Sequence, residues 1–270
     1  MKPRRNLFLG TLVVIALSQS AFAATHYWDG ASATWNDAVN WSTDSGADTP
    51  DPLAVTGITD DAIFNITTVD GNMVVTLDAN QLANSLTFDN TGTTAIQANA
   101  SDTTARSLTL AAGGITLNSG AGAVTLGGGS NGATNLVIDA NQSWTNNSSS
   151  LLTVTAGLAI NNALTIGGSG NATISGGAPS DLSRIWTGGG GVTKTGAGTL
   201  NITGNISSAQ GRWTIGNGYG GNFTMEQGAM NLSGISYITL GDGSTANAIY
   251  NQMDGTVLLS PAEDSTTRGV

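Results

Sequence analysis

The sequence contains no cysteine and a single histidine, His26, among its 270 residues. Zinc sites built from cysteine and histidine, Cys–His pairs and Ser-His-Asp triads are therefore not expected, because the chain does not supply their residues. Without disulfides, the fold depends on burial of apolar side chains and on backbone hydrogen bonds. Few helices are expected, since no stretch after residue 23 shows a sustained apolar stripe at helical spacing.

Basic residues are also scarce. Beyond residue 23 the chain has five Lys and Arg against eighteen Asp and Glu, a net charge of −13. Such a chain cannot form the basic patch that phosphate groups attract, so neither nucleic acid nor an anionic membrane surface is expected as a partner. Most of the acids are Asp residues placed among Gly and Asn, which is typical of turns in strand-rich proteins.

Residues 1–23 have the three parts of a cleavable signal peptide. A positively charged start precedes the apolar run Leu7–Leu17, which is too short to span a bilayer as a mature helix. The small residues of AFA (21–23) then provide the cleavage site. The sequence therefore predicts export and a mature chain that begins near Ala24.

A short apolar-Thr-apolar pattern recurs along the rest of the chain. Its copies are SLTF (85–88), SLTL (107–110), GITL (114–117), AVTL (123–126), ALTI (163–166), RWTI (212–215), NFTM (222–225) and YITL (237–240). Alternation at period two places the apolar pair on one face of a strand and Thr on the other. Clusters of Gly, Asn, Ser and Asp bound each copy and supply turns. The pattern predicts many short, half-buried strands.

Longer repetition appears near the C-terminus, where Thr214 matches Thr239 at an offset of 25 and Phe223 matches Tyr250 at an offset of 27. Periods of 20 to 50 residues indicate solenoids or propellers, and propeller blades need longer strands than these. Short strands with glycine-marked corners favour an all-β fold, a β-solenoid of the parallel β-helix type. Apolar residues of successive turns would then stack inside, with Thr and Asn ladders at corners and on the outer face.

The stretch GGGGVTKTGAGTLNITGNIS (188–207) is so rich in glycine that an ordinary compact domain would lose much backbone conformational entropy by ordering it. In a solenoid, glycine serves corners that need positive φ or a close approach of two backbones. Residues 190–204 resemble the autotransporter-associated β-strand repeat, also called the passenger-associated transport repeat. That family's form is two glycines, an apolar residue, a Lys, Gly-x-Gly and an alternating strand that ends in Gly. The matching residues are Gly190, Gly191, Lys194, Gly196, Gly198 and Gly204.

The resemblance implies a right-handed parallel β-helix in a bacterial secreted passenger, often a large surface protein or adhesin. It brings no catalytic residue, because the family motif contains none. The expectation is a structural or adhesive protein without enzyme activity, cofactor or metal, located outside the cell or on the outer-membrane surface of a Gram-negative-type bacterium. Surface glycans or other cells are its expected partners. We also expect Lys194 to lie on a solvated face.

The expected organisation is a signal peptide (1–23), a Trp-rich N-terminal cap segment (24–70) and β-solenoid repeats (71–270). The sequence lacks the succession of alternating strands of about ten residues that a membrane barrel needs. An outer-membrane anchor or translocator is therefore expected outside this chain, and the repeats are expected to continue in a longer protein.

The first alternative is a polysaccharide lyase or glycosidase built on the same fold. Such an enzyme would use carboxylates on neighbouring turns, and Asp181 with Arg184, or Asp242, could contribute. Asp60 and Asp61 could flank a calcium ion. For each Asp, a turn residue is the favoured interpretation.

The second alternative is a carbohydrate-binding surface protein. Trp28, Trp35 and Trp41 form the densest aromatic stretch of the chain, interleaved with Asp and Asn. Exposed indole faces could stack on sugar rings while the polar side chains bind hydroxyl groups. The competing interpretation is a cap, in which the three rings cover the apolar end of the first turn and block edge-to-edge pairing. The cap interpretation is the favoured one.

Overall fold

The computed structural model describes residues 23–30, 33–46, 55–66, 73–101, 103–128, 134–176 and 186–203, followed by six strands between residues 212 and 260. The regular secondary structure among these residues is almost entirely β-strand, as the sequence predicts. The helical segment among them is a single 3₁₀ turn, Ala38–Asn40. Within the described part of the chain, no helix has the length and apolar character that crossing a membrane requires.

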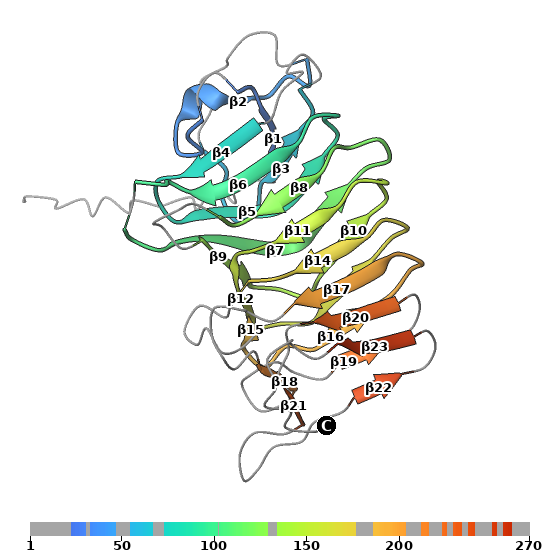
Figure 1. The fold of residues 1–270 in the computed structure, drawn as a ribbon. Helices are drawn as coiled ribbons and strands as arrows, with labels where there is room; N and C mark the ends of the chain where they lie inside the picture. The colour runs from blue at the N-terminus through green and yellow to red at the C-terminus, as the bar shows by residue number, and fades with distance from the viewer. Residues whose placement is uncertain are drawn as a thin grey trace, which may run out of the picture.

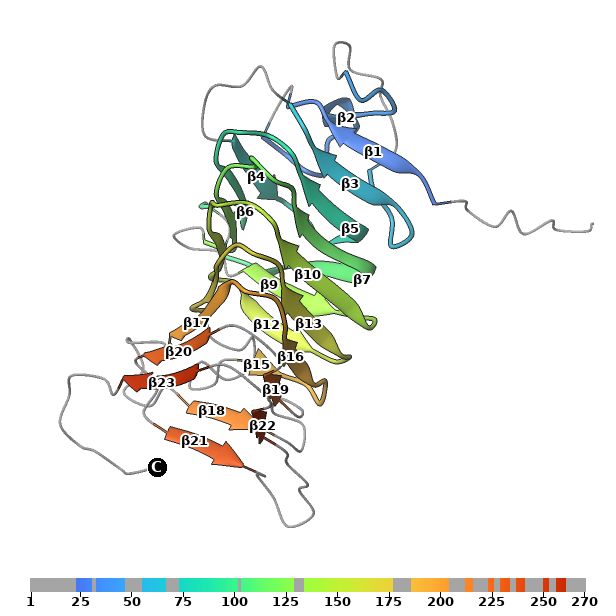
Figure 2. The ribbon, with the colours of Figure 1, turned by 90° about the vertical axis from the view of Figure 1, so that its right-hand side faces the viewer.

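Most strands belong to three rows of parallel strands (Figures 1 and 2). The first row contains the first halves of β5 (Gln81–Phe88) and β7 (Arg106–Leu117), then β9 (Thr134–Ile138), β12 (Gly157–Ile160) and β15 (Trp186–Thr187). The second row contains β1 (Thr25–Trp28), β3 (Asp61–Phe64), the second halves of β5 and β7, β10 (Gln142–Asn146), β13 (Leu164–Gly167), β16 (Val192–Lys194), β19 (Phe223–Met225) and β22 (Tyr250–Gln252).

The third row contains β4 (Met73–Leu77), β6 (Thr94–Ala98), β8 (Val124–Leu126), β11 (Leu152–Val154), β14 (Ala172–Ile174), β17 (Thr199–Thr203), β20 (Ala229–Ser233) and β23 (Thr256–Ser260). Two further strands, β18 (Arg212–Ile215) and β21 (Tyr237–Leu240), pair in parallel with each other. The short strand β2 (Trp41–Ser42) pairs with β1 and is antiparallel to it. From β5 to β17 the chain visits the first, second and third rows in that order, again and again.

The register between neighbouring strands follows the sequence repeats. Thr214 pairs with Thr239, and Phe223 pairs with Tyr250, so the alignment read from the sequence is confirmed. The repeat length varies along the chain: Trp144 pairs with Ile115, 29 residues earlier, and with Ile166, 22 residues later. Insertions and deletions are therefore taken up in the corners, while the paired strands keep their register. The predicted parallel pairing of successive repeats is confirmed.

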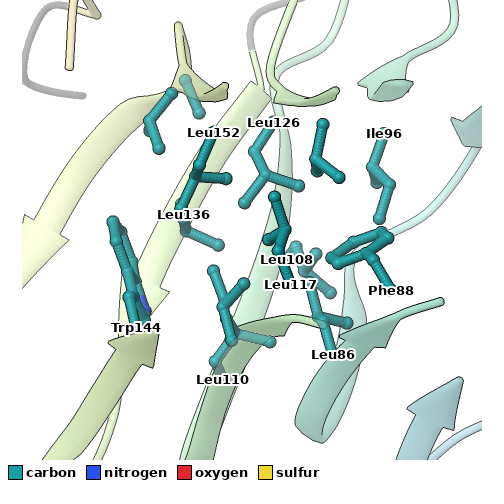
Figure 3. Close-up of a cluster of buried hydrophobic side chains, with 14 of the residues drawn as sticks. Leu86, Phe88, Ile96, Leu108, Leu110, Leu117, Leu126, Leu136, Trp144 and Leu152 are labelled. Atoms are coloured by element: carbon teal, nitrogen blue, oxygen red, sulfur yellow. The ribbon is translucent and has the colours of Figure 1, made fainter. Parts of the chain in front are cut away.

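Alternating burial shows which side of each row faces the interior. Leu86 and Phe88 are fully buried, whereas Thr87 between them is half-exposed. Side chains from all three rows converge on the same space in Figure 3, with Leu110 from the first row, Trp144 from the second and Leu126 from the third. One continuous apolar cluster therefore runs along the stack. Its size supplies the stability that disulfides do not, since burial contributes about 25 cal/mol per Å² of apolar surface.

Candidate functional site

A cluster of five aromatic side chains closes the N-terminal end of the stack, where β1 and β2 lie (Figure 1). We call it the aromatic end; its members are Trp28, Trp35, Trp41, Phe64 and Phe88. The ring of Trp41 contacts both other indoles edge-on, with centroids 5.0 Å from Trp28 and 4.9 Å from Trp35. Phe64 stacks on Phe88 of the next repeat at 5.0 Å. All five side chains are at most 1% exposed.

Hydrogen bonds fix two of the indoles in place. The Nε1 of Trp41 donates to the carbonyl of Trp35 at 2.9 Å, and the Nε1 of Trp35 donates to the Oγ1 of Thr56 at 3.2 Å. The hydroxyl of Thr56 in turn donates to the carbonyl of Leu82, on β5, at 2.8 Å. A buried indole N–H costs stability unless it is paired, so these bonds let the rings pack in the interior.

The same segment covers the edge strands at this end. The third row begins with β4, whose Thr76 accepts a hydrogen bond from the N–H of Trp35 (2.9 Å) and donates to the carbonyl of Ala33 (2.6 Å). The second row is closed by the antiparallel β2. On the first row, the N–H of Asn84 donates to the carbonyl of Asp60 at 2.7 Å. Some backbone groups of each row thus find partners within the chain, which hinders pairing with another molecule there.

The burial of Trp28, Trp35 and Trp41 bears directly on the two interpretations of the Trp-rich segment. A sugar platform needs indole faces open to solvent, because stacking occurs on the ring face. Here the faces are covered by each other, by Phe64 and by the surrounding strands. The geometry therefore supports the cap interpretation, and glycan binding through these residues stays a prediction.

The motif glycines lie where the backbones of successive repeats approach closely. A Cβ at Gly190 would overlap the carbonyl of Asn162, and one at Gly198 would overlap the carbonyl of Gly170. Gly196 has φ +69°, a conformation that side chains disfavour. The carbonyl of Gly191 accepts a hydrogen bond from the N–H of Leu164. Gly204 lies outside the described residues.

The prediction that Lys194 lies on a solvated face is wrong. Its side chain points inward from β16 and is 2% exposed. The Nζ donates to the carbonyls of Thr195 (2.6 Å) and Gly196 (2.9 Å), and burial lowers its pKa from the ordinary lysine value. The error arose because a charged residue is normally exposed, whereas alternation along Val192-Thr193-Lys194 places Lys194 on the same side as Val192.

Asp60 and Asp61 serve the backbone and neighbouring side chains. The carboxylate of Asp60 accepts from the N–H groups of Ala24 (3.0 Å) and Gly57 (2.7 Å). The carboxylate of Asp61 accepts from Asn84 Nδ2 (2.7 Å) and Ser85 Oγ (2.6 Å). The Asp61 carboxylate thus ties the N-terminal segment to β5, while the Asp60 carboxylate joins parts of that segment to each other.

Other candidates lie beyond the part of the chain that the structure describes. These are the signal peptide up to residue 22, the pair Asp181 and Arg184, and Asp242. Among the described residues, no group of three or more His, Cys, Asp or Glu side chains is arranged to hold a metal ion.

Sequence reasoning missed several buried residues. Trp144 lies in the core with its Nε1 bonded to Gln142 Oε1 at 3.0 Å, although its strand QSWTN lacks the apolar pair. Asn90 and Asn146 are buried at corners between the second and third rows. Alternation with known inward neighbours could have identified Trp144. No local signal distinguishes the two buried asparagines from the many exposed ones.

Comparisons of the chain with family models, with curated proteins and with solved structures gave no match. Membership of the autotransporter-associated repeat family stays a prediction from residues 190–204.

The close approach at Gly198 gives a first prediction. The substitution Gly198→Ala is expected to lower the free energy of unfolding by about 1–3 kcal/mol, because the new methyl group forces the Gly170 backbone away. The matched control is Gly189→Ala, where a Cβ meets nothing within 4 Å, and its expected effect is within about 0.5 kcal/mol. Denaturant titration of both variants measures the difference. Equal stabilities would contradict the close approach.

The aromatic end gives a second prediction. Trp35→Ala is expected to lower the free energy of unfolding by about 3–5 kcal/mol, because it leaves a large cavity beside Trp41 and Phe64. Val39→Ala, in the same segment but at a side chain that is 40% exposed, is expected to change it by less than about 0.5 kcal/mol. Thermal unfolding, monitored by tryptophan fluorescence, provides the measurement. A Trp35→Ala protein as stable as the wild type would mean that this segment is no cap.

Proposed function

We propose that this protein is an exported, right-handed parallel β-helix of the autotransporter-associated repeat type with a structural or adhesive role at the bacterial cell surface. Its action is mechanical and adhesive rather than catalytic. The observation that carries the proposal is the stacking of successive repeats in three parallel rows that are sealed at the N-terminal end. A rod of this kind acts as a spacer between the bacterial surface and whatever the rod binds. Each repeat contacts only its neighbours.

The outward faces support this role. Thr125, Thr153 and Thr173 lie in register on the third row, and Asn201 continues the line. On the second row, Thr116 and Thr145 are in register and half-exposed. Uniform rows of small polar side chains form an extended surface that could bind a partner through many weak contacts. Surface glycans and the surfaces of other cells present hydroxyl groups that such side chains bind.

Export and surface display test the proposal first. When the full chain is expressed in a Gram-negative host, N-terminal sequencing of the product is expected to begin at Ala24. The substitution Ala23→Phe is expected to block cleavage and leave the precursor, because signal peptidase needs a small residue at that position. A product that keeps its first residues and stays inside the cell would overturn the proposed location.

Adhesion and catalysis are then separated with the purified mature protein. Beads coated with it are expected to bind cells or immobilised polysaccharides, while soluble polysaccharides incubated with it show no new reducing or unsaturated ends. Release of such ends would favour the lyase or glycosidase alternative. Polysaccharide binding that Trp35→Ala abolishes without any loss of stability would favour the carbohydrate-binding alternative through the Trp-rich segment.

A further inference from the structure

The one lysine beyond residue 23, Lys194, occupies a core position. It ends β16 and pairs with Ile166 on β13, which itself pairs with Trp144 and so continues a column of inward side chains. The other inward residues of this column down to Leu86 are apolar and buried. Placing an amine there costs free energy unless its N–H groups are paired.

The amine pairs with the corner that joins β16 to β17. Its two acceptors, the carbonyls of Thr195 and Gly196, are the first two of that corner. The corner is also held from outside the repeat, since the N–H of Thr195 donates to the carbonyl of Ile166 and the Gly196 backbone packs on Gly168. The Lys194 amine thus bonds to this corner from the interior of the stack, while the preceding repeat contacts the same corner through its backbone.

Earlier corners between the second and third rows are held from within by asparagine. Asn90 Nδ2 donates to the carbonyl of Gly92 at 2.8 Å. Asn146 Nδ2 donates to the carbonyls of Ser150 and Asn171, both at 2.8 Å, and so serves two successive corners. Lys194 satisfies carbonyls at the equivalent corner of a later repeat with an ionisable group.

We propose that Lys194 is an internal clamp whose amine holds the β16–β17 corner, and whose proton makes the stability of this part of the stack depend on pH. It acts as a positioning residue for the corner backbone. Among the described residues, neither of the two strands that pair with β16, β13 and β19, carries an ionisable side chain.

The direction of the pH effect follows from burial. Desolvation lowers the pKa of Lys194 in the folded protein, so the folded state loses this proton at a lower pH than the unfolded chain. The unfolding free energy therefore gains a contribution as the pH rises from the lowered pKa towards about 10.4, the value of a free lysine. A neutral amine keeps two N–H groups, which is enough for both carbonyls.

Hydrogen exchange of the full chain tests the clamp. Lys194→Met keeps the length of the side chain and removes its donors, and it is expected to speed amide exchange of residues 192–203 by at least about tenfold. Exchange in β3 and β5 is expected to stay unchanged. The matched control is Thr193→Ala, an outward side chain on the same strand, with exchange like that of the wild type. Unchanged or slower exchange in Lys194→Met would overturn the clamp.

The pH dependence is tested with a second variant, which also serves if Lys194→Met fails to fold. Lys194→Gln retains an N–H₂ donor but does not titrate. The exchange protection of residues 192–203, taken relative to Lys194→Gln at each pH, is expected to rise in the wild type as the pH increases from the lowered pKa of Lys194 towards about 10.4. A constant ratio across this range would show that the Lys194 proton plays no part.

Discussion

Parallel backbone pairing between successive repeats is the constraint on which the rest of this structure depends. Paired strands lie about 4.8 Å apart, so corner residues that stack directly on the preceding repeat bring their backbones similarly close. At such places as Gly198 over Gly170 there is no space for a Cβ. The abundance of glycine is therefore a packing requirement of the stack, and its entropic cost is met by the apolar column that the strands enclose.

A stack of parallel strands has open ends, and each end exposes unpaired backbone and apolar side chains. The N-terminal segment solves both problems at once. Its rings cover the interior, while Ala33 to Trp35, β2 and Asp60 bond to backbone groups of the three rows. The only antiparallel pair in the described chain, β1 with β2, lies here, and β2 is an edge strand of only two residues, which offers little backbone for pairing with another molecule.

The interior is not uniformly apolar, and several of its polar residues lie at or beside corners. Turn carbonyls that point inward need donors, since water does not reach them. Asn146 and Lys194 supply these donors from strand ends, and Asn90 supplies one from the corner itself. Corner length can then vary between repeats without disturbing the paired strands, which explains how offsets of 22 and 29 residues coexist around Trp144.

The sequence by itself determined the strands, since alternation at period two depends only on neighbouring residues, and it determined the parallel register of Thr214 with Thr239 through the repeat. It also indicated that the Trp-rich segment lies at an end. The local sequence does not determine which polar and aromatic side chains are buried, and here only the tertiary structure decided it. Lys194 and Asn146 are inside, and the three indoles face each other instead of solvent. Burial of a polar side chain depends on carbonyls brought close by the stacking of distant residues, and that proximity exists only once the repeats have assembled.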